Sequence, residues 1–405
     1  MKLLFPLLLA LALCAGSVAQ AAPAKKRPTA TKAVKAKPAK AKAAKPAKGK
    51  AGKGKVAAKV KEPVKPARIV APVDYSGEQV NFGEWKAVSD FADEISLRHG
   101  FPRDELRSLI SQIRYIDSAV QLVKPAPPGK PKNMNAVRDL MIEPVRVNAG
   151  IKFWNEQAAV LARAENEFGV PAEVIVGIIG IETVYGRNTG RFRILDVLTT
   201  LGFAYPEAPN QAARMAFFQG ELENALVLAR KNRIDPFTLL GSFAGAIGMP
   251  QFMPGSVLAY GVDYDGDGNV DLRNSTADAI GSVASFLVQH GWKRHEGGPL
   301  VYPANVAPGR SWEAMLGQGL AAKYKLPELL AAGIATPLPP PADRMYGLID
   351  LQNGADATEY WIATNNFYAI TQYNRSYFYA MSVIELGRAV KQARGDAALI
   401  SAETL

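Results

Sequence analysis

The most constraining feature of this chain is an uninterrupted apolar run over residues 174–181, Val-Ile-Val-Gly-Ile-Ile-Gly-Ile, that ends directly at Glu182. A run without polar side chains must be buried on all sides, as a central helix or as a strand. The run is too short for periodicity to decide, and its isoleucines and valines also suit a strand. Gly169 and Pro171 favour a helix, because glycine ends a preceding helix and proline begins the next one. We therefore expect a buried helix that ends at Glu182.

At the end of such a helix, the charged form of Glu182 would be energetically unfavourable. Dehydration and the negative end of the helix dipole both disfavour its charged form, so its pKa is expected to be raised. A carboxylic acid that stays protonated near neutral pH can hand a proton to a poor leaving group such as a glycosidic oxygen. The alternative is an ordinary helix-end glutamate that points at water, and the local pattern alone does not separate the two.

The N-terminus has the pattern of an export signal over residues 1–21. A basic start, an apolar core over residues 3–13 and the A-x-A pattern Ala19-Gln20-Ala21 are typical of a cleaved signal peptide. Cys14 is the only cysteine, and it is either lost with the signal or carries a lipid. Leu13 argues against the lipid, because the residue before a lipidated cysteine is normally small. We expect a periplasmic protein, with a lipid-anchored outer-membrane form as the alternative.

Residues 22–72 are expected to form a disordered basic linker. They contain 17 lysines and arginines against one acidic residue, Glu62, and almost nothing large and apolar. Subtracting these 17 and Lys2 from the 48 basic residues, and Glu62 from the 37 acidic ones, leaves 30 basic against 36 acidic residues for the rest. The positive charge therefore belongs to the linker, which would suit an anionic envelope surface, with a solvated spacer as the alternative. Nucleic acid is not expected as a partner.

Residues 73–405 are long enough for one large core with small insertions or for two lobes, and they are expected to be mainly α-helical, with small accessory lobes. Apolar residues at spacings of three and four predict helices over residues 85–99, 103–116, 147–168 and 276–289. The stretch 297–347 is rich in proline, glycine and alanine, and it is expected to be a small excursion from the main fold.

A cluster of acidic residues over 263–275 matches the opening of an EF-hand calcium loop. The oxygen-bearing side chains of this loop that we expect to bind the metal are Asp263, Asp265, Asp267, Asn269 and Asp271, with Gly268 at the glycine position. Asn274 stands where the usual bidentate glutamate would be. Four crowded carboxylates repel one another unless a hard cation gathers them, so we expect a weakly bound, structural Ca²⁺.

Two further segments have the composition of a saccharide-binding surface. Residues 241–255 combine four glycines with a single amide, Gln251, which can donate and accept hydrogen bonds at once. Residues 365–379 set tyrosines and phenylalanines among amides, and such aromatics stack on sugar rings while their polar tips bond the ring edges. Tight packing without a ligand remains the alternative for both segments.

The three histidines, at 99, 290 and 295, have no metal-ligand spacing, and no serine or cysteine has a nucleophile motif around it. Triad hydrolases and zinc enzymes are therefore disfavoured. Carboxylate chemistry is what remains.

The order of motifs along the chain closely resembles the membrane-bound lytic murein transglycosylase B family, over nearly everything after Gly100. Besides the aspartate loop, the motifs that carry the resemblance are Phe153-Trp-Asn, the run through Glu182-Thr-Val-Tyr-Gly-Arg187, Arg193-Ile-Leu-Asp196, Gly220-Glu-Leu-Glu223, residues 241–254, Asp278-Ala-Ile-Gly-Ser-Val-Ala284 and residues 366–374. The resemblance implies a lysozyme-like helical core with an inserted EF-hand-type loop. It also implies cleavage of the MurNAc-GlcNAc bond of peptidoglycan without water, with Glu182 as the acid and then the base, and no catalytic cofactor.

The resemblance further implies which side chains bind the sugar. These are Ser242, Gln251, Phe286, Tyr373, Asn374 and Tyr379. Phe286 stands where the family often has tyrosine, and the segment before Arg214 is less basic than a pair of peptide-binding arginines requires, so stem-peptide recognition is not implied. The implied partners are glycan strands and other cell-wall enzymes. A hydrolytic muramidase and a non-catalytic wall-binding protein are the alternatives.

Overall fold

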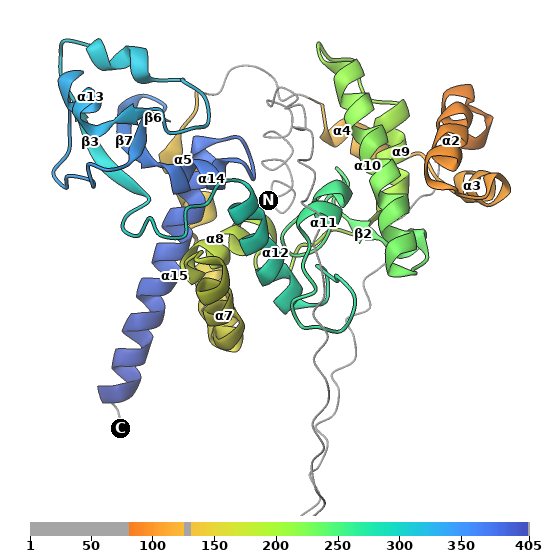
Figure 1. The fold of residues 1–405 in the computed structure, drawn as a ribbon, viewed down its shortest axis with the longest axis horizontal. Helices are drawn as coiled ribbons and strands as arrows, with labels where there is room; N and C mark the ends of the chain where they lie inside the picture. The colour runs from red at the N-terminus through yellow and green to blue at the C-terminus, as the bar shows by residue number, and fades with distance from the viewer. Residues whose placement is uncertain (1–80, 125–130, 404–405) are drawn as a thin grey trace, which may run out of the picture. The chain divides into compact units, whose positions relative to one another are not determined.

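The computed structural model describes residues 81–124 and 131–403, with side chains to residue 395. The expected signal peptide, Cys14 and the basic linker 22–72 lie outside the described residues. The described chain is mainly helical, as expected (Figure 1). Its α-helices are α2 (Lys86–His99), α3 (Arg103–Ile110), α4 (Asp117–Leu122), α5 (Met134–Met141), α6 (Pro144–Glu156), α7 (Ala158–Phe168), α8 (Ala172–Thr183), α9 (Ile194–Phe203), α10 (Gln211–Asn232), α11 (Pro254–Tyr260), α12 (Thr276–Gln289), α13 (Leu326–Ala331), α14 (Asn365–Thr371) and α15 (Tyr377–Glu403).

The apolar run is a helix, α8, and it lies at the centre of the main hydrophobic core. Gly169 ends α7 in the left-handed conformation, and Pro171 is the residue that caps the start of α8, as the sequence indicated. The glycines of the run serve close packing against α15 (Figure 1). A Cβ atom on Gly177 would lie 2.2 Å from the Val383 carbonyl oxygen, so only glycine lets the two helices approach this closely.

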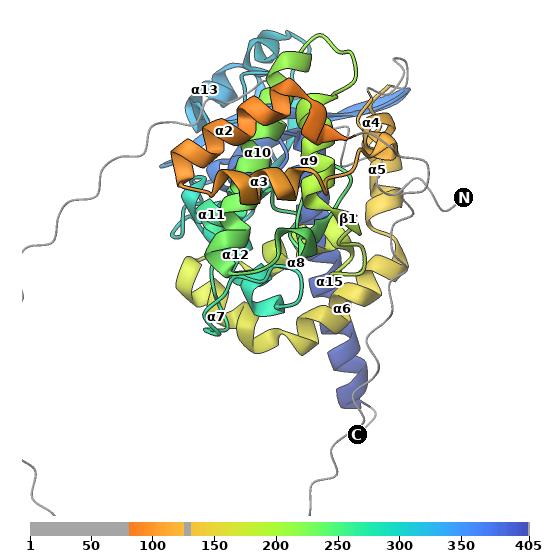
Figure 2. The same cartoon turned by 90° about the vertical axis from the view of Figure 1, so that its right-hand side faces the viewer.

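A second group of helices packs around α9 and α10. Figure 2 shows α2 and α3 lying across these two helices. The rings of Phe91 on α2 and Phe203 on α9 meet edge to face, and Arg98 on α2 pairs with Glu223 on α10. Within the described residues, no helix is both long enough and apolar enough to cross a membrane.

Two of the expected helices differ from the prediction, since one ends earlier and the other is divided in two. The helix expected over residues 103–116 ends at Ile110, and the N–H groups of residues 111–113 close its last turn. Beyond that turn the backbone bonds to α9. The Arg114 N–H donates to the Asp196 carboxylate at 3.1 Å, and the Ile116 N–H donates to Thr200 Oγ1 at 3.0 Å. The helix expected over residues 147–168 is broken at Gln157, where α6 ends and α7 begins.

The proline-rich stretch 297–347 belongs to a small antiparallel sheet. Its strands are β3 (Val301–Val306), β4 (Tyr324–Lys325), β5 (Ile334–Ala335), β6 (Met345–Asn353) and β7 (Asp356–Thr364), in the order β4-β6-β7-β3-β5. Ile349 pairs with Trp361 in the central β6–β7 hairpin. Tyr302, Leu329 and Tyr346 contribute to a second, smaller hydrophobic core on this sheet. The remaining strands, β1 (Phe192–Arg193) and β2 (Leu240–Gly241), form a separate short pair.

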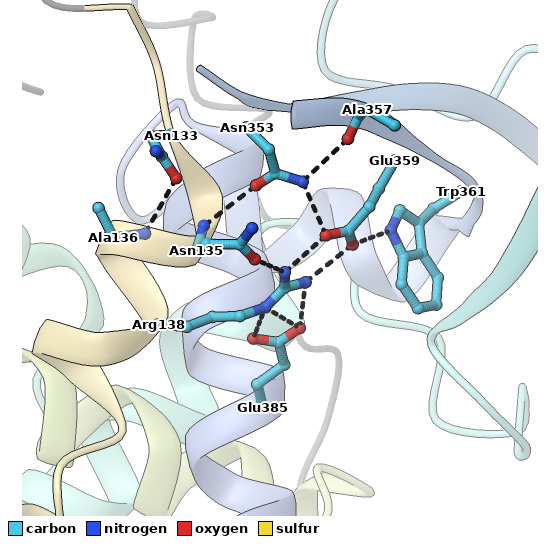
Figure 3. Close-up of polar contacts among 9 residues, drawn as sticks. All are labelled: Asn133, Asn135, Ala136, Arg138, Asn353, Ala357, Glu359, Trp361 and Glu385. Atoms are coloured by element: carbon cyan, nitrogen blue, oxygen red, sulfur yellow. Dashed lines mark hydrogen bonds and ion pairs between the residues drawn. The ribbon is translucent and has the colours of Figure 1, made fainter. Parts of the chain in front are cut away.

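Arg138 on α5 ties the sheet to α15. Its guanidinium forms a two-pronged ion pair with Glu359 on β7, at 2.6 and 2.8 Å, and bonds Glu385 on α15 at 2.8 to 3.1 Å (Figure 3). Asn353 donates to the Glu359 carboxylate from the neighbouring strand, and the Trp361 indole does so from β7 itself (Figure 3). The two glutamates therefore share one cation that fixes three elements against one another.

Candidate active site

Glu182 lies in the last turn of α8, where protein surrounds its side chain but leaves it partly accessible. Burial raises the pKa of Glu182 to about 8, although a hydrogen bond from Tyr379 acts in the opposite direction. The cost of dehydrating the charge exceeds what a single hydroxyl restores. The side chain is therefore protonated at neutral pH and is reachable from outside.

Tyr379 is the direct partner of the acid. It comes from the first turn of α15, and its hydroxyl donates to Glu182 Oε1 at 2.7 Å. The Tyr379 ring stacks on Tyr373, with centroids 6.0 Å apart and planes at 13°. Burial and the nearby Glu182 carboxylate hold the pKa of both tyrosines well above the ordinary value, so both hydroxyls stay available as donors.

The chain reverses sharply after the acid, in a turn formed by Val184 and Tyr185. Both residues adopt left-handed conformations, with φ values of 51° and 58°, and Gly186 continues at 82°. Left-handed backbone is rare for a β-branched residue, so this turn is strained. Backbone strain of this kind clusters at functional sites.

Gln251 lies in a second strained segment, with φ of 52°. Its side-chain amide donates to the Gly248 carbonyl at 2.9 Å. The carbonyl of the preceding residue, Pro250, accepts a 2.5 Å hydrogen bond from the Tyr373 hydroxyl. The Gln251 segment is thus held against the same tyrosine that stacks on the partner of Glu182.

An aromatic cluster supports Tyr373 from behind. The Phe286 ring lies 4.8 Å from the Tyr373 ring and stacks on His290 at 3.9 Å, and Phe252 lies 5.8 Å from Tyr373. Phe286 is itself buried, so it is part of the wall behind Tyr373. Burial lowers the pKa of His290, which keeps that imidazole neutral within the cluster.

Two other predicted site residues lie on the same segments. Ser242 follows β2, and its hydroxyl oxygen accepts the Ala246 N–H at 3.0 Å. Asn374 directly follows Tyr373 and is half-buried. The structure thus connects Glu182 to Tyr379 and Tyr373, and through Tyr373 to the segment of Gln251.

Two of the five predicted ligands of the aspartate loop lie in one group of carboxylates. Asp263 and Asp265 each place a carboxylate oxygen within 4.8 Å of the other and of Asp278, the acid in the first turn of α12. Asp271 instead accepts the backbone N–H groups of Arg273 and Asn274. Asp267 is not part of the three-carboxylate group either.

The EF-hand pattern is defined by consecutive positions of the loop and therefore does not include Asp278. This residue lies in the first turn of α12, which packs against the loop. Asp278 is buried, and its carboxylate accepts the N–H groups of Tyr264 and Asp271 at 2.7 and 2.8 Å. Its pKa is raised by burial. Three carboxylates within ligand distance of one another match the donor set that Ca²⁺ prefers.

Most of the described chain matches one known family. Residues 83–388 match the family described as the transglycosylase SLT domain. Membrane-bound lytic murein transglycosylase B of Escherichia coli is 42% identical over 314 residues, covering 75% of this chain and 82% of that protein.

Two solved structures share the fold, which confirms the lysozyme-like helical architecture expected from the motifs. Lytic transglycosylase SltB1 from Pseudomonas aeruginosa is 41% identical, with a TM-score of 0.70, over 77% of this chain and 99% of that one. Lytic transglycosylase Slt35 of Escherichia coli, solved in complex with calcium, is 39% identical, with a TM-score of 0.67, over 80% of this chain and 96% of that one.

Proposed function

The chain belongs to the transglycosylase SLT domain family, and on that premise we propose that it is a peptidoglycan lytic transglycosylase with Glu182 as its single acid and base. It cleaves the β-1,4 bond between MurNAc and GlcNAc without water. The observation that carries the assignment of Glu182 is its place at the end of the buried helix α8, where its side chain is partly accessible, accepts the Tyr379 hydroxyl, and has its pKa raised by burial to about 8. A neutral carboxylic acid that a substrate can reach is what protonation of a glycosidic oxygen requires.

Glu182 acts twice in this reaction. Because Oε1 accepts the Tyr379 hydroxyl, Oε2 carries the proton in the neutral acid and gives it to the glycosidic oxygen as the bond to C1 breaks. The resulting carboxylate then takes the proton from the muramyl 6-hydroxyl, whose oxygen attacks C1 and closes a 1,6-anhydro ring. The proton that leaves Glu182 in the first step is replaced in the second, so no water is consumed.

The chemistry needs one carboxylate, in contrast to glycosidases that use two. The 2-acetamido group of the substrate takes the place of the second carboxylate by stabilising the cation at C1. Glu221 is another glutamate whose pKa is raised by burial, and its carboxylate is bonded to the Gly255 N–H at 2.7 Å and to Asn224. Glu221 therefore serves the start of α11 and is not assigned to catalysis.

Sugar binding is assigned to the side chains around the acid. They are Ser242, Gln251, Tyr373, Asn374 and Tyr379, with Phe286 behind Tyr373. Stacked tyrosines and an amide held in one orientation suit the faces and edges of sugar rings.

Ca²⁺ is assigned to Asp263, Asp265 and Asp278, in a structural role. Its charge would offset the repulsion among three carboxylates and fix the loop 263–275 on α12. The protein acts in the periplasm, where the basic linker binds an anionic envelope surface.

The test is product analysis with purified sacculi. Wild-type protein should release anhydromuropeptides, and Glu182→Gln should release none while keeping its fold. Glu173→Gln is the matched control, because Glu173 lies at the other end of α8 and pairs with Lys391. Products heavier by one water would identify a muramidase, and binding of sacculi without release would identify a wall-binding protein.

A further inference from the structure

Thr183, which directly follows the acid, connects the two strained segments of the site. Its side chain is fully buried. Its hydroxyl oxygen accepts the Gly186 N–H at 3.0 Å, within the left-handed turn after Glu182. Its hydroxyl hydrogen is donated to the Met249 carbonyl at 2.8 Å, two residues before Gln251. One hydroxyl therefore joins the end of α8 to the segment that carries Gln251.

The Met249 carbonyl is a better acceptor for the Thr183 hydroxyl hydrogen than the Ile179 carbonyl. The Ile179 carbonyl, one helical turn back, is 3.4 Å away, at the outer limit of a hydrogen bond. The backbone of Met249 is also held through its N–H group, which donates to the Leu272 carbonyl at 2.8 Å. Met249 is thus fixed between Thr183 and the aspartate loop.

The turn itself is anchored independently at Tyr185. The Tyr185 ring packs against Phe153, with centroids 5.1 Å apart. Its hydroxyl group packs closely against Gly150 and Gly180. A Cβ atom would lie 2.4 Å from the hydroxyl oxygen on Gly150 and 2.5 Å from it on Gly180. Because Tyr185 fixes the far side of the turn, losing the Thr183 hydroxyl should free the Met249 side without unfolding α8.

We propose that Thr183 is a positioning residue, whose hydroxyl holds Gln251 in register with Glu182 so that a bound sugar presents its glycosidic oxygen to the acid. This inference rests on the proposed transglycosylase function. Strained backbone needs surrounding contacts that over-determine it, and Thr183 supplies one to each of the two strained segments. A shift of about 1 Å between reacting groups can cost on the order of 100-fold in rate.

The experiment compares Thr183→Val with Thr183→Ser. Valine keeps the shape of threonine and removes the hydroxyl, whereas serine keeps the hydroxyl. Thr200→Val is the matched control, because Thr200 is also fully buried and its hydroxyl also joins two segments, at Ile116 on the far side of α9. The readouts are kcat and KM on a defined glycan oligomer, the pH profile of kcat, and the thermal unfolding midpoint.

A positioning role predicts that Thr183→Val lowers kcat by roughly 10- to 100-fold, by the same factor at every pH. The high-pH limb of the profile should stay in place, because Thr183 does not contact the Glu182 carboxylate. Thr183→Ser should restore kcat to within a few-fold of wild type, and Thr200→Val should lower the unfolding midpoint while keeping kcat.

The inference is overturned if Thr183→Val keeps kcat within about twofold of wild type, or if the folded Thr183→Ser enzyme is as slow as the valine variant. Wild-type protein is assayed first. Absence of anhydro products from the wild type would overturn the proposed function together with this inference, whereas a fully active Thr183→Val enzyme would overturn this inference alone.

Discussion

The Tyr379 hydroxyl donates a 2.7 Å hydrogen bond to Oε1 of Glu182, across 197 residues of sequence. The bond has two opposing consequences. It orients the carboxyl group, so that Oε2 is left for the substrate, and it stabilises the charged form, which lowers the pKa. Burial outweighs this second effect, and the pKa is raised to about 8. The site therefore combines an oriented acid with one that is protonated at neutral pH.

The first prediction concerns the pH dependence of cleavage. The reaction needs protonated Glu182, so kcat/KM should fall as the pH rises through about 8. Tyr379→Phe removes the hydrogen bond that lowers this pKa, so the fall in kcat/KM should move to higher pH. The value of kcat should also decrease, because the Glu182 carboxyl group is then less well oriented. Initial rates on a glycan oligomer between pH 5 and 10 would measure both effects. A limb that moves to lower pH in Tyr379→Phe would contradict the assignment.

The second prediction concerns stability. The folded-state pKa of Glu182 is raised from 4.5 to about 8, so the wild-type protein loses stability as the pH rises from 4.5 to 8. Glu182→Gln lacks this cost and should be more stable than wild type by roughly 3 kcal/mol at pH 7, but by less than about 1 kcal/mol at pH 5. Urea unfolding at the two pH values would test this. Glu173→Gln, on the same helix, should show no such gain at pH 7.

The third prediction concerns the ion-pair network of Figure 3. Arg138 lowers the pKa of Glu359 to about 2, chiefly through its hydrogen bonds. A lowered folded-state pKa contributes stability above about 4.5 that is lost as the pH falls toward 2. Arg138→Met leaves two partly buried glutamates without their cation and should cost about 2 kcal/mol at pH 7.

Thermal unfolding at pH 7 and pH 3 would measure the effect of Arg138→Met. The difference between variant and wild type should shrink at pH 3, because Glu359 then takes up a proton when the wild-type protein unfolds. Lys152→Met is a suitable control, since Lys152 forms an exposed ion pair with Glu156 and its loss should cost under about 1 kcal/mol. An equal loss of stability in both variants would show that the Arg138 network contributes no more than an exposed ion pair.

The fourth prediction concerns Ca²⁺. Adding Ca²⁺ to chelator-treated protein should raise the thermal midpoint, because a ligand that binds only the folded state stabilises it. Asp263→Asn should abolish most of this rise, since Asp263 belongs to the three-carboxylate group. Asp267→Asn, which changes an aspartate outside that group, should keep more of it. The assignment of ligands fails if Asp267→Asn loses the response and Asp263→Asn keeps it.

The sequence predicted the features that depend on neighbouring residues. The helix α8 follows from an apolar run that begins after Pro171 and ends at a single carboxylate, and the capping role of Gly169 follows from its freedom to adopt a positive φ of 68°. The raised pKa of Glu182 was predictable for the same reason, because burial of the run implies dehydration of the residue at its end.

Other local predictions failed where distant partners competed. The helix expected through residue 116 ends at Ile110, and beyond its closing turn the N–H groups of Arg114 and Ile116 bond to Asp196 and Thr200 on α9 instead of to helix carbonyls. Residues 297–347 are a different case, because the sequence predicts only a small excursion there, and their strand β3 joins a sheet by pairing with β7, which lies beyond residue 347.

What the chain determines by local composition is thus where an acid will be buried and how its helix begins and ends. Only the tertiary structure decided that Tyr379 would orient this acid, that Thr183 would reach Met249, and that Asp278 would join the aspartate loop. Each of these contacts brings together groups that are far apart along the chain or on different elements. Their formation depends on how helices pack, and packing is set by the whole core and not by any short pattern.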